Sequence, residues 1–142
     1  SYDAGNQAYE GSYNANYPTT AHYLVGNYYQ WSAATAGYTG TSQSTQSICP
    51  KGWTLPSQSQ FQQLINSGLS GSNSMNAPYC LLRGGYLNTS SLILAGSYGS
   101  YWSSSSSSSS TTYNLYLDSD SIHTNNKMHH YYGIPVRCVF AG

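Results

Sequence analysis

The stretch ICPKGWTLPSQSQFQQLINSG (residues 48–68) predicts one capped amphipathic helix. Ser57 is suited to cap its N-terminus, and Gln60 follows three residues later, as in a capping box. Apolar side chains then recur with the i, i+3, i+4 spacing of one helix face, at Phe61, Leu64 and Ile65. Gly68 is a typical stop signal, so we expect the helix to end just before it.

The rest of the chain predicts short strands separated by turns. Aromatic and β-branched residues favour a strand in AHYLVGNYYQW (21–31), and residues 32–47 have loop composition. In TTYNLYLD (111–118) the apolar residues alternate with more polar neighbours, which is typical of a half-buried strand. We expect strands broken by glycine over 79–87 and 92–102, and a final strand over 133–140, at an edge or bulge because it contains Pro135.

Eight consecutive serines occupy residues 103–110. Because both flanking segments are strand-like, we expect this run to be part strand and part turn rather than a linker. One helix followed by many short strands predicts an α+β fold. The length of 142 residues permits one domain of average size. We therefore divide the chain into an extended lead-in (residues 1–20) and one domain (residues 21–142).

Charged residues are scarce. Four Lys or Arg and four Asp or Glu make up 6% of the chain, against roughly 25% in an ordinary domain. With a net charge of +0 the chain lacks the basic field that nucleic-acid binding or polybasic membrane docking requires. Its longest apolar run, Leu92 to Ala95, falls far short of the ~20 residues needed to span a membrane. We expect a surface of hydroxyl, amide and phenol groups, with no nucleic-acid partner and no membrane insertion.

Three fragments together resemble a known family: ICPKGWTLPSQSQF (48–61), GSYWSSSS (99–106) and YYGIPVRCV (131–139). Their order and spacing resemble the Fibrobacter succinogenes major paralogous domain and the related C-terminal domain of collagen-like bacterial adhesins. GNYYQWSAATAG (26–37) is similar to that family's first core strand. The resemblance implies a C-type-lectin-like fold, with a twisted, mainly antiparallel sheet and one or two flanking helices. It also implies a secreted or surface-anchored bacterial protein.

The resemblance places Cys49 just before the helix and Cys138 in the last strand, and it implies a disulfide between them. The spacing of the three cysteines fits no zinc pattern. The alternative is three reduced, buried thiols in a cytosolic protein. Cys80 is then free and buried, or paired with another chain or with an upstream segment. Family members often carry such a segment, similar to G-N-C-W-M, and its absence predicts a fragment or processed product.

Two tryptophans lie inside the matching fragments. We expect Trp53 and Trp102 to be core aromatics that fix the helix against the sheet, with sugar stacking as the alternative. Because few carboxylates are available to pair with them, we expect Arg83 and Arg137 to bond backbone carbonyls.

His123, His129 and His130 lie in a polar stretch that we interpret as a solvated loop. A metal site needs three or four converging ligands with a supporting shell, which these residues alone do not establish. Asp118 and Asp120 would be near enough in sequence for a Ser-His-Asp triad, but no G-x-S-x-G elbow places a serine. The calcium signatures of true C-type lectins are also missing. We therefore expect no metal, no cofactor and no enzymatic activity.

Residues 103–132 are dense in Ser, Thr, Tyr, Asn, Asp and His, which dominate adaptable binding surfaces. A charge-poor secreted protein could also use these residue types throughout, as residues 1–20 do. The leading prediction is an extracellular or cell-surface, non-enzymatic binding or adhesion module. It would contact a glycan or a cell-surface protein by stacking and neutral hydrogen bonds. The candidate binding residues are Tyr113, Tyr116, His123, Asn125, Asn126, His129 and Tyr131.

A second prediction belongs to another class, a structural subunit of an extracellular filament. A near-neutral surface lacks the charge repulsion that keeps proteins monomeric. Residues 1–20 would be extended and could add a strand to a neighbour's sheet edge. A heterologous contact of that kind can propagate as a fibre.

Overall fold

The computed structural model describes residues 28–38, 40, 42–88, 91–94 and 96–140, so the predicted lead-in (1–20) lies outside the described residues. The helices and strands in chain order are α3 (Trp31–Ala34), β1 (Trp53–Thr54), α4 (Gln58–Asn66), β2 (Tyr86–Leu87), β3 (Leu92–Ile93), β4 (Gly99–Ser106), β5 (Thr111–Leu117), β6 (Ile122–His129) and β7 (Val139–Phe140). No helix within these described ranges is long and apolar enough to cross a membrane.

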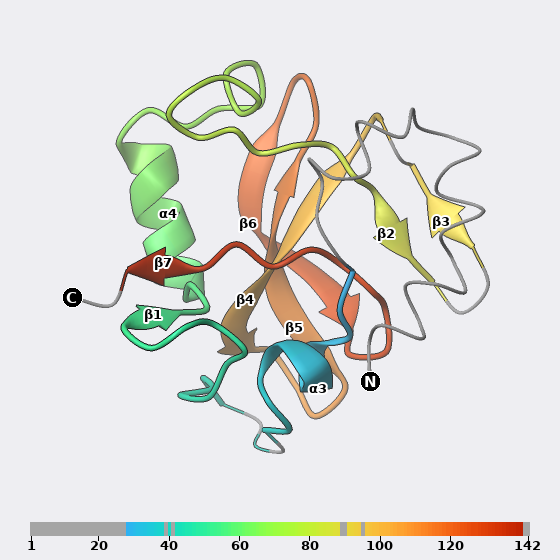
Figure 1. The fold of residues 1–142 in the computed structure, drawn as a ribbon. Helices are drawn as coiled ribbons and strands as arrows, with labels where there is room; N and C mark the ends of the chain where they lie inside the picture. Colours follow the sequence, from blue (N-terminus) through green and yellow to red (C-terminus); the bar gives the residue numbers. More distant parts are fainter. Residues whose placement is uncertain (1–27, 39, 41, 89–90, 95, 141–142) are drawn as a thin grey trace.

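The central sheet consists of β4, β5 and β6 in that order, and both of its pairings are antiparallel. Two antiparallel ribbons, β1–β7 and β2–β3, lie outside this sheet. Helix α4 lies on one side of the central strands, and the β2–β3 ribbon lies on the other (Figure 1). The prediction of an α+β fold with a mainly antiparallel sheet is therefore confirmed, with two helices in the described part of the chain.

Helix α4 begins and ends where the sequence predicts. The Ser57 hydroxyl accepts a hydrogen bond from the Gln60 amide at 3.1 Å, and the Gln60 side chain accepts one from the Ser57 amide at 2.8 Å. This closes the capping box. At the other end the Leu69 amide donates to the Leu64 carbonyl across Gly68, whose φ is +124°. That geometry is the Schellman type of helix ending, which favours glycine at this position.

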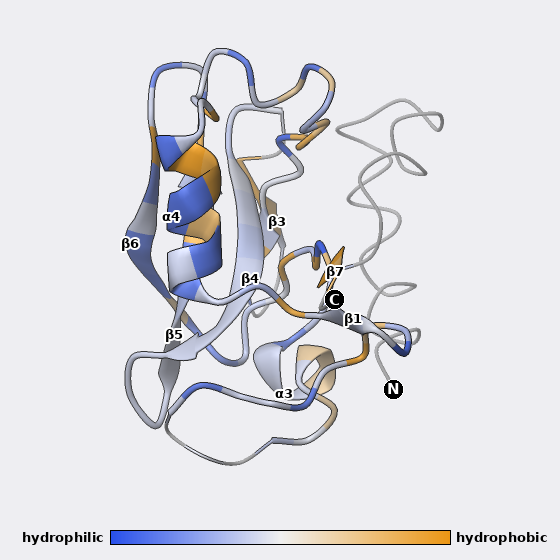
Figure 2. Ribbon diagram, turned by 90° about the vertical axis from the view of Figure 1, so that its left-hand side faces the viewer, coloured by the Kyte–Doolittle hydropathy of each residue, from blue (hydrophilic) through white to orange (hydrophobic). Residues whose placement is uncertain are grey.

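The central sheet separates two apolar clusters. The cluster on the α4 side contains Phe61, Leu69, Leu81, Tyr101, Leu115 and Leu117, and α4 turns its apolar stripe toward the sheet (Figure 2). The cluster on the other side contains Trp31, Ala34, Leu55, Trp102, Met128 and Ile134. Tyr101 and Trp102 are neighbours on β4 and join different clusters, because successive side chains of a strand point to opposite faces. Trp102 is fully buried, as predicted.

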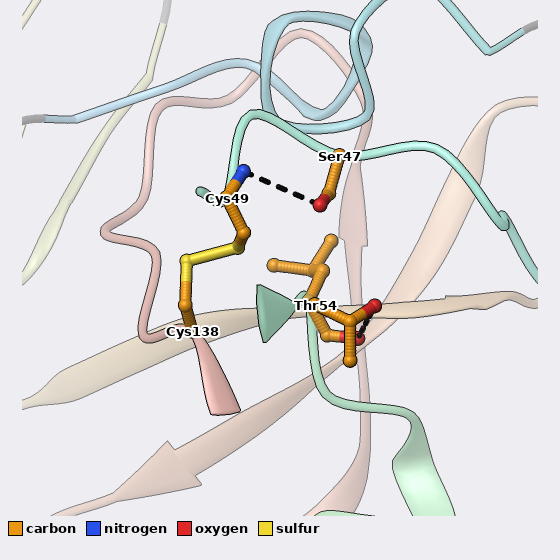
Figure 3. Close-up of a disulfide and its surroundings, with 5 residues drawn as sticks. Ser47, Cys49, Thr54 and Cys138 are labelled. Atoms are coloured by element: carbon orange, nitrogen blue, oxygen red, sulfur yellow. Dashed lines mark hydrogen bonds between the residues drawn. A yellow bond between two sulfur atoms is a disulfide. The ribbon is translucent and has the colours of Figure 1, made fainter. Parts of the chain in front are cut away.

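The disulfide that the resemblance implies is present. Cys49 and Cys138 are bonded with their Cα atoms 5.9 Å apart, at a sequence separation of 89. The bond joins the turn before β1 to the residue before β7 (Figure 3). The alternative of three reduced, buried thiols is therefore wrong. Cys80 is exposed and forms no disulfide with the described residues, so the alternative that it is free and buried is wrong. Its pairing with another chain or an upstream segment stays a prediction.

Two predicted strands are interrupted by backbone turns. Of the segment 79–87, only β2 is a strand, and it follows Cys80 with a φ of +51°. The segment 92–102 splits into β3 and β4, because Leu94 and Gly96 between them have φ values of +57° and +89°. The break at Gly96 agrees with the expectation that glycines interrupt this segment. The positive φ values of Cys80 and Leu94 are rare for non-glycine residues and are not indicated by the sequence.

The two ends of the described chain also differ from the prediction. Trp31–Ala34 form α3, where the sequence predicted the end of a strand and the start of a loop. The final strand is reduced to β7, and Ile134 forms only an isolated bridge with Tyr29. The serine run is part strand (Ser103–Ser106) and part bend, as predicted.

Candidate functional site: a strip of aromatic rings

The predicted binding residues do not form one face. Along β5 the side chains alternate, so Tyr116 shares a face with Asn114 while Tyr113 lies on the side of Leu115, which packs under α4. Tyr113 is paired across the sheet with Lys127, whose ammonium lies 5.7 Å from its ring centre. Among the described residues, the Tyr113 ring makes no ring contact with the other predicted aromatic residues.

The remaining predicted aromatic residues belong to a continuous strip of ring contacts. The centroid distances are 4.5 Å for His123–Tyr116, 4.5 Å for Tyr116–Tyr98, 5.6 Å for Tyr98–Tyr86, 5.4 Å for Tyr86–Tyr132, 5.4 Å for Tyr132–His129 and 5.1 Å for His129–Tyr131. Both stacked and edge-on contacts occur along this series, and these two arrangements are the favoured geometries of aromatic pairs. We call these residues the aromatic strip.

Three members of the aromatic strip were missed by sequence reasoning, namely Tyr86, Tyr98 and Tyr132. They come from β2, from the residue before β4 and from the segment after β6. Tyr98 is 7% exposed, whereas Tyr131 at the end of the strip is 49% exposed. The strip therefore has a buried centre and an exposed end, and only the pairing of distant segments reveals it.

An amide network lies beside the centre of the strip. The Asn126 side-chain amide donates to Asn114 Oδ1 at 3.0 Å and to the Tyr98 hydroxyl at 3.4 Å. The Asn114 amide in turn donates to the Ser100 hydroxyl. Asn114 is fully buried, so these bonds satisfy polar groups that would otherwise cost free energy. Asn126 thus belongs to the site, whereas Asn125 is exposed at an irregularity in the β5–β6 register.

Asp118 fixes the phenol of Tyr116. The Tyr116 hydroxyl donates to Asp118 Oδ2 at 2.9 Å, while Oδ1 accepts from the amides of Asp120 and Ser121, each at 2.8 Å. The amide of Asp120, then that of Ser121, then the Tyr116 hydroxyl lower the pKa of Asp118 to about 2. Burial, followed by the bond to this carboxylate, raises the pKa of Tyr116. The β5–β6 turn therefore presents Tyr116 as a neutral, oriented phenol.

The histidines do not form the solvated loop that the sequence predicted. His123 and His129 lie on β6, because the polar segment is an edge strand of the sheet. His130 is not part of the aromatic strip. It stacks on Trp31 with the ring centroids 4.4 Å apart, and burial there lowers its pKa. The described residues contain no group of three His, Cys, Asp or Glu that could hold a metal ion.

Two cations and one tryptophan outside the strip were also predicted. Arg83 donates to the Gly71 carbonyl at 3.2 Å and Arg137 to the Cys80 carbonyl at 3.4 Å, which confirms that both bond backbone carbonyls. Trp53 is 47% exposed, so the prediction that it is a core residue is wrong. It lies on the short β1–β7 ribbon, which presents it outward instead of under the sheet.

Comparison of the chain with known protein families, curated proteins and solved structures gave no match. The class that the structure itself defines is an α+β protein with mainly antiparallel strands and a disulfide.

Tyr98 gives a pH-dependent test of the strip's centre. Burial, with smaller contributions from Tyr116 and Tyr86, raises its pKa from 10.0 to about 12. The folded state therefore favours the neutral phenol, so this stabilisation is complete below pH ~10 and is lost as pH rises toward ~12. We expect absorbance at 295 nm to show a late-ionising fraction of the tyrosines, and Tyr98→Phe to reduce that fraction and to flatten the alkaline loss of stability. If Tyr98→Phe leaves both curves unchanged while Tyr131→Phe alters them, the assignment is wrong.

Proposed function

We propose that this protein is an extracellular, non-enzymatic binding or adhesion module with a C-type-lectin-like fold, and that the aromatic strip is its binding surface. The observation that carries the proposal is the continuous contact of seven rings across segments far apart in the chain. The disulfide supports an oxidising, extracellular location. The three sequence fragments and the antiparallel α+β architecture support the C-type-lectin-like assignment.

The chemistry of the strip favours a neutral glycan as the ligand. Sugar rings present apolar C–H faces that stack on Tyr, and hydroxyl groups that pair with phenols and side-chain amides. The strip and the adjoining network contain phenols, imidazoles and the amide of Asn126. The carboxylate bonded to Tyr116, that of Asp118, already accepts hydrogen bonds from two backbone amides. A cell-surface protein is the alternative ligand, held by the same Tyr-rich contacts.

The test compares two variants of the same chemistry, one inside the aromatic strip and one outside it. Tyr131→Ala removes an exposed ring at the accessible end of the strip, and Tyr113→Ala removes a ring on the α4 side of the sheet. On a glycan array we expect the wild type to bind neutral glycans. Tyr131→Ala should weaken binding about tenfold, which corresponds to about 1.4 kcal/mol, while Tyr113→Ala leaves it unchanged.

A blank glycan array with the wild type would contradict the glycan proposal. Equal losses from both variants would contradict the assignment of the strip. Binding to an immobilised cell-surface protein extract that Tyr131→Ala weakens, in the absence of glycan binding, would favour the protein ligand.

A further inference from the structure

A second exposed aromatic pair lies away from the aromatic strip, on the β1–β7 ribbon. Trp53 and Phe140 face each other across the ribbon, with ring centroids 5.5 Å apart in an edge-on arrangement. Trp53 is 47% exposed and Phe140 is 66% exposed, the highest value among the exposed large hydrophobic residues of the described chain. Two large rings in contact with solvent at one place indicate an interaction site rather than a core element.

Two hollows adjoin the pair, one beside both rings and one beside Phe140. One hollow, of about 320 Å³, opens between Trp53 and Phe140 and is lined at depth by Phe61 and Leu81, which are 2% and 4% exposed. The other, of about 400 Å³, is lined by Gln60 and other residues of α4 and shares Phe140 with the first. Hollows of this size accommodate a ring-sized group. We call the two rings and their hollows the β1–β7 patch.

The β1–β7 patch is also cationic. Arg137 lines the first hollow, and its guanidinium donates only one long hydrogen bond, 3.4 Å to the Cys80 carbonyl. Lys51 is exposed and directly precedes Gly52. The Phe140 ring lies close to Gly52, 4.0 Å from the point where a Cβ atom on that glycine would stand. Neither cation is paired with a carboxylate of the described chain, whose two acidic residues lie at the β5–β6 turn. The patch therefore fits an aromatic side chain next to a carboxylate.

The chain itself carries that combination twice. Its four acidic residues are Asp3, Glu10, Asp118 and Asp120, and the first two each follow a tyrosine directly, as Tyr2-Asp3 and Tyr9-Glu10. The remaining two belong to the β5–β6 turn. Of the four acidic side chains, Asp3 and Glu10 are the two that directly follow a ring of the kind the hollow accommodates.

We propose that the N-terminal segment of one copy docks on the β1–β7 patch of a neighbouring copy. A tyrosine ring would enter the hollow beside Trp53, and the adjacent carboxylate would pair with Arg137 or Lys51. The contact joins two different surfaces of identical chains, so it is heterologous and can propagate along a row of subunits. A net charge of +0 leaves no long-range repulsion to oppose it. The inference does not rest on the proposed function, because it uses another face of the molecule.

Full-length charge-reversal variants test this contact by sedimentation velocity at low ionic strength. We expect the wild type to associate in a concentration-dependent manner. Asp3→Lys with Glu10→Lys, and separately Lys51→Glu with Arg137→Glu, should each weaken association at least tenfold. An equimolar mixture of the two variants should restore it, because each reversed segment then meets a complementary patch. Lys127→Glu, an exposed reversal on β6, should leave association unchanged.

A mixture that associates no better than the separate variants would overturn the proposal, as would a wild type that is monomeric at every concentration. A monomer whose Trp53 fluorescence responds to the Asp3 and Glu10 substitutions would show docking within one chain, which also overturns the intermolecular contact. Of the four reversed positions, Lys51 and Arg137 are exposed, and Asp3 and Glu10 lie outside the described residues. Near-ultraviolet circular dichroism checks that each variant is folded. Lys51→Gln with Arg137→Gln repeats the patch test without introducing negative charge.

Discussion

Removing the Cys49–Cys138 disulfide should lower the free energy of unfolding by about 4–5 kcal/mol, because the crosslink closes a long loop and restricts the unfolded chain. The loop spans a sequence separation of 89, which includes α4 and all three strands of the central sheet. The β1–β7 ribbon that the bond adjoins contains only two residue pairs, so little else ties these ends together. The measurement is urea unfolding of the Cys49→Ser, Cys138→Ser double variant, extrapolated to water.

Cys80→Ser is the matched control. Cys80 is exposed and unbonded, so its replacement should change the free energy of unfolding by less than about 0.5 kcal/mol. A typical domain is stable by about 5–15 kcal/mol, and the expected loss is therefore a large share of the total. A double variant within 1 kcal/mol of the Cys80→Ser protein would show that the unfolded chain is already compact without the crosslink.

The disulfide lies beside one of the two proposed surfaces, so its removal should affect them differently. It adjoins the β1–β7 patch, whereas the aromatic strip is held by the central sheet and by bonds such as Asn126 to Asn114. At temperatures where the double variant is still folded, self-association should therefore weaken before glycan binding does. The two activities depend on different parts of the same fold.

The features that the sequence predicted correctly are those with local signals. The capping box of Ser57 and Gln60 and the stop at Gly68 lie within one short segment, and each satisfies backbone groups of its own helix. The disulfide was implied by the resemblance, because the spacing of the cysteines alone does not select a pairing. The serine run was placed correctly because both of its neighbours are strand-like.

The features that failed depend on contacts between distant segments. Nothing near Cys80 or Leu94 in sequence indicates a positive φ at these two residues, although the glycines of both segments predicted that the strands are broken. Trp53 and Trp102 both lie in fragments that resemble the family, but only the pairing of β1 with β7 shows that Trp53 faces outward.

Four of the seven rings of the aromatic strip were predicted from the sequence, and three were not. Tyr113 and Tyr116 are three residues apart on a strand with period two, so their separation onto opposite faces could have been predicted. Tyr86, Tyr98 and Tyr132 join the strip only because β2, β4 and the segment after β6 meet in space. No local sequence pattern predicts that these segments come into contact.

Trp102→Ala should lower the free energy of unfolding by about 3–5 kcal/mol, as expected for a large aromatic residue removed from a packed core. The Trp102 side chain is 0% exposed, and its Nε1–H donates to the Tyr29 carbonyl at 2.6 Å. Trp53→Ala is the matched substitution on the surface and should cost about 1 kcal/mol, since it removes a ring contact with Phe140 and leaves no cavity.

Trp102→Phe keeps the folded state measurable if the alanine variant does not fold. It retains most of the ring but loses the N–H donor, so we expect a loss of about 1–3 kcal/mol in urea unfolding. The order Trp102→Ala, Trp102→Phe, Trp53→Ala in decreasing cost follows from the burial of Trp102 and from the hydrogen bond that its N–H donates. If Trp53→Ala proved as costly as Trp102→Ala, the β1–β7 patch would be part of the core and could not serve as a docking surface. The same three variants therefore test both the packing of the sheet and the premise of the self-association proposal.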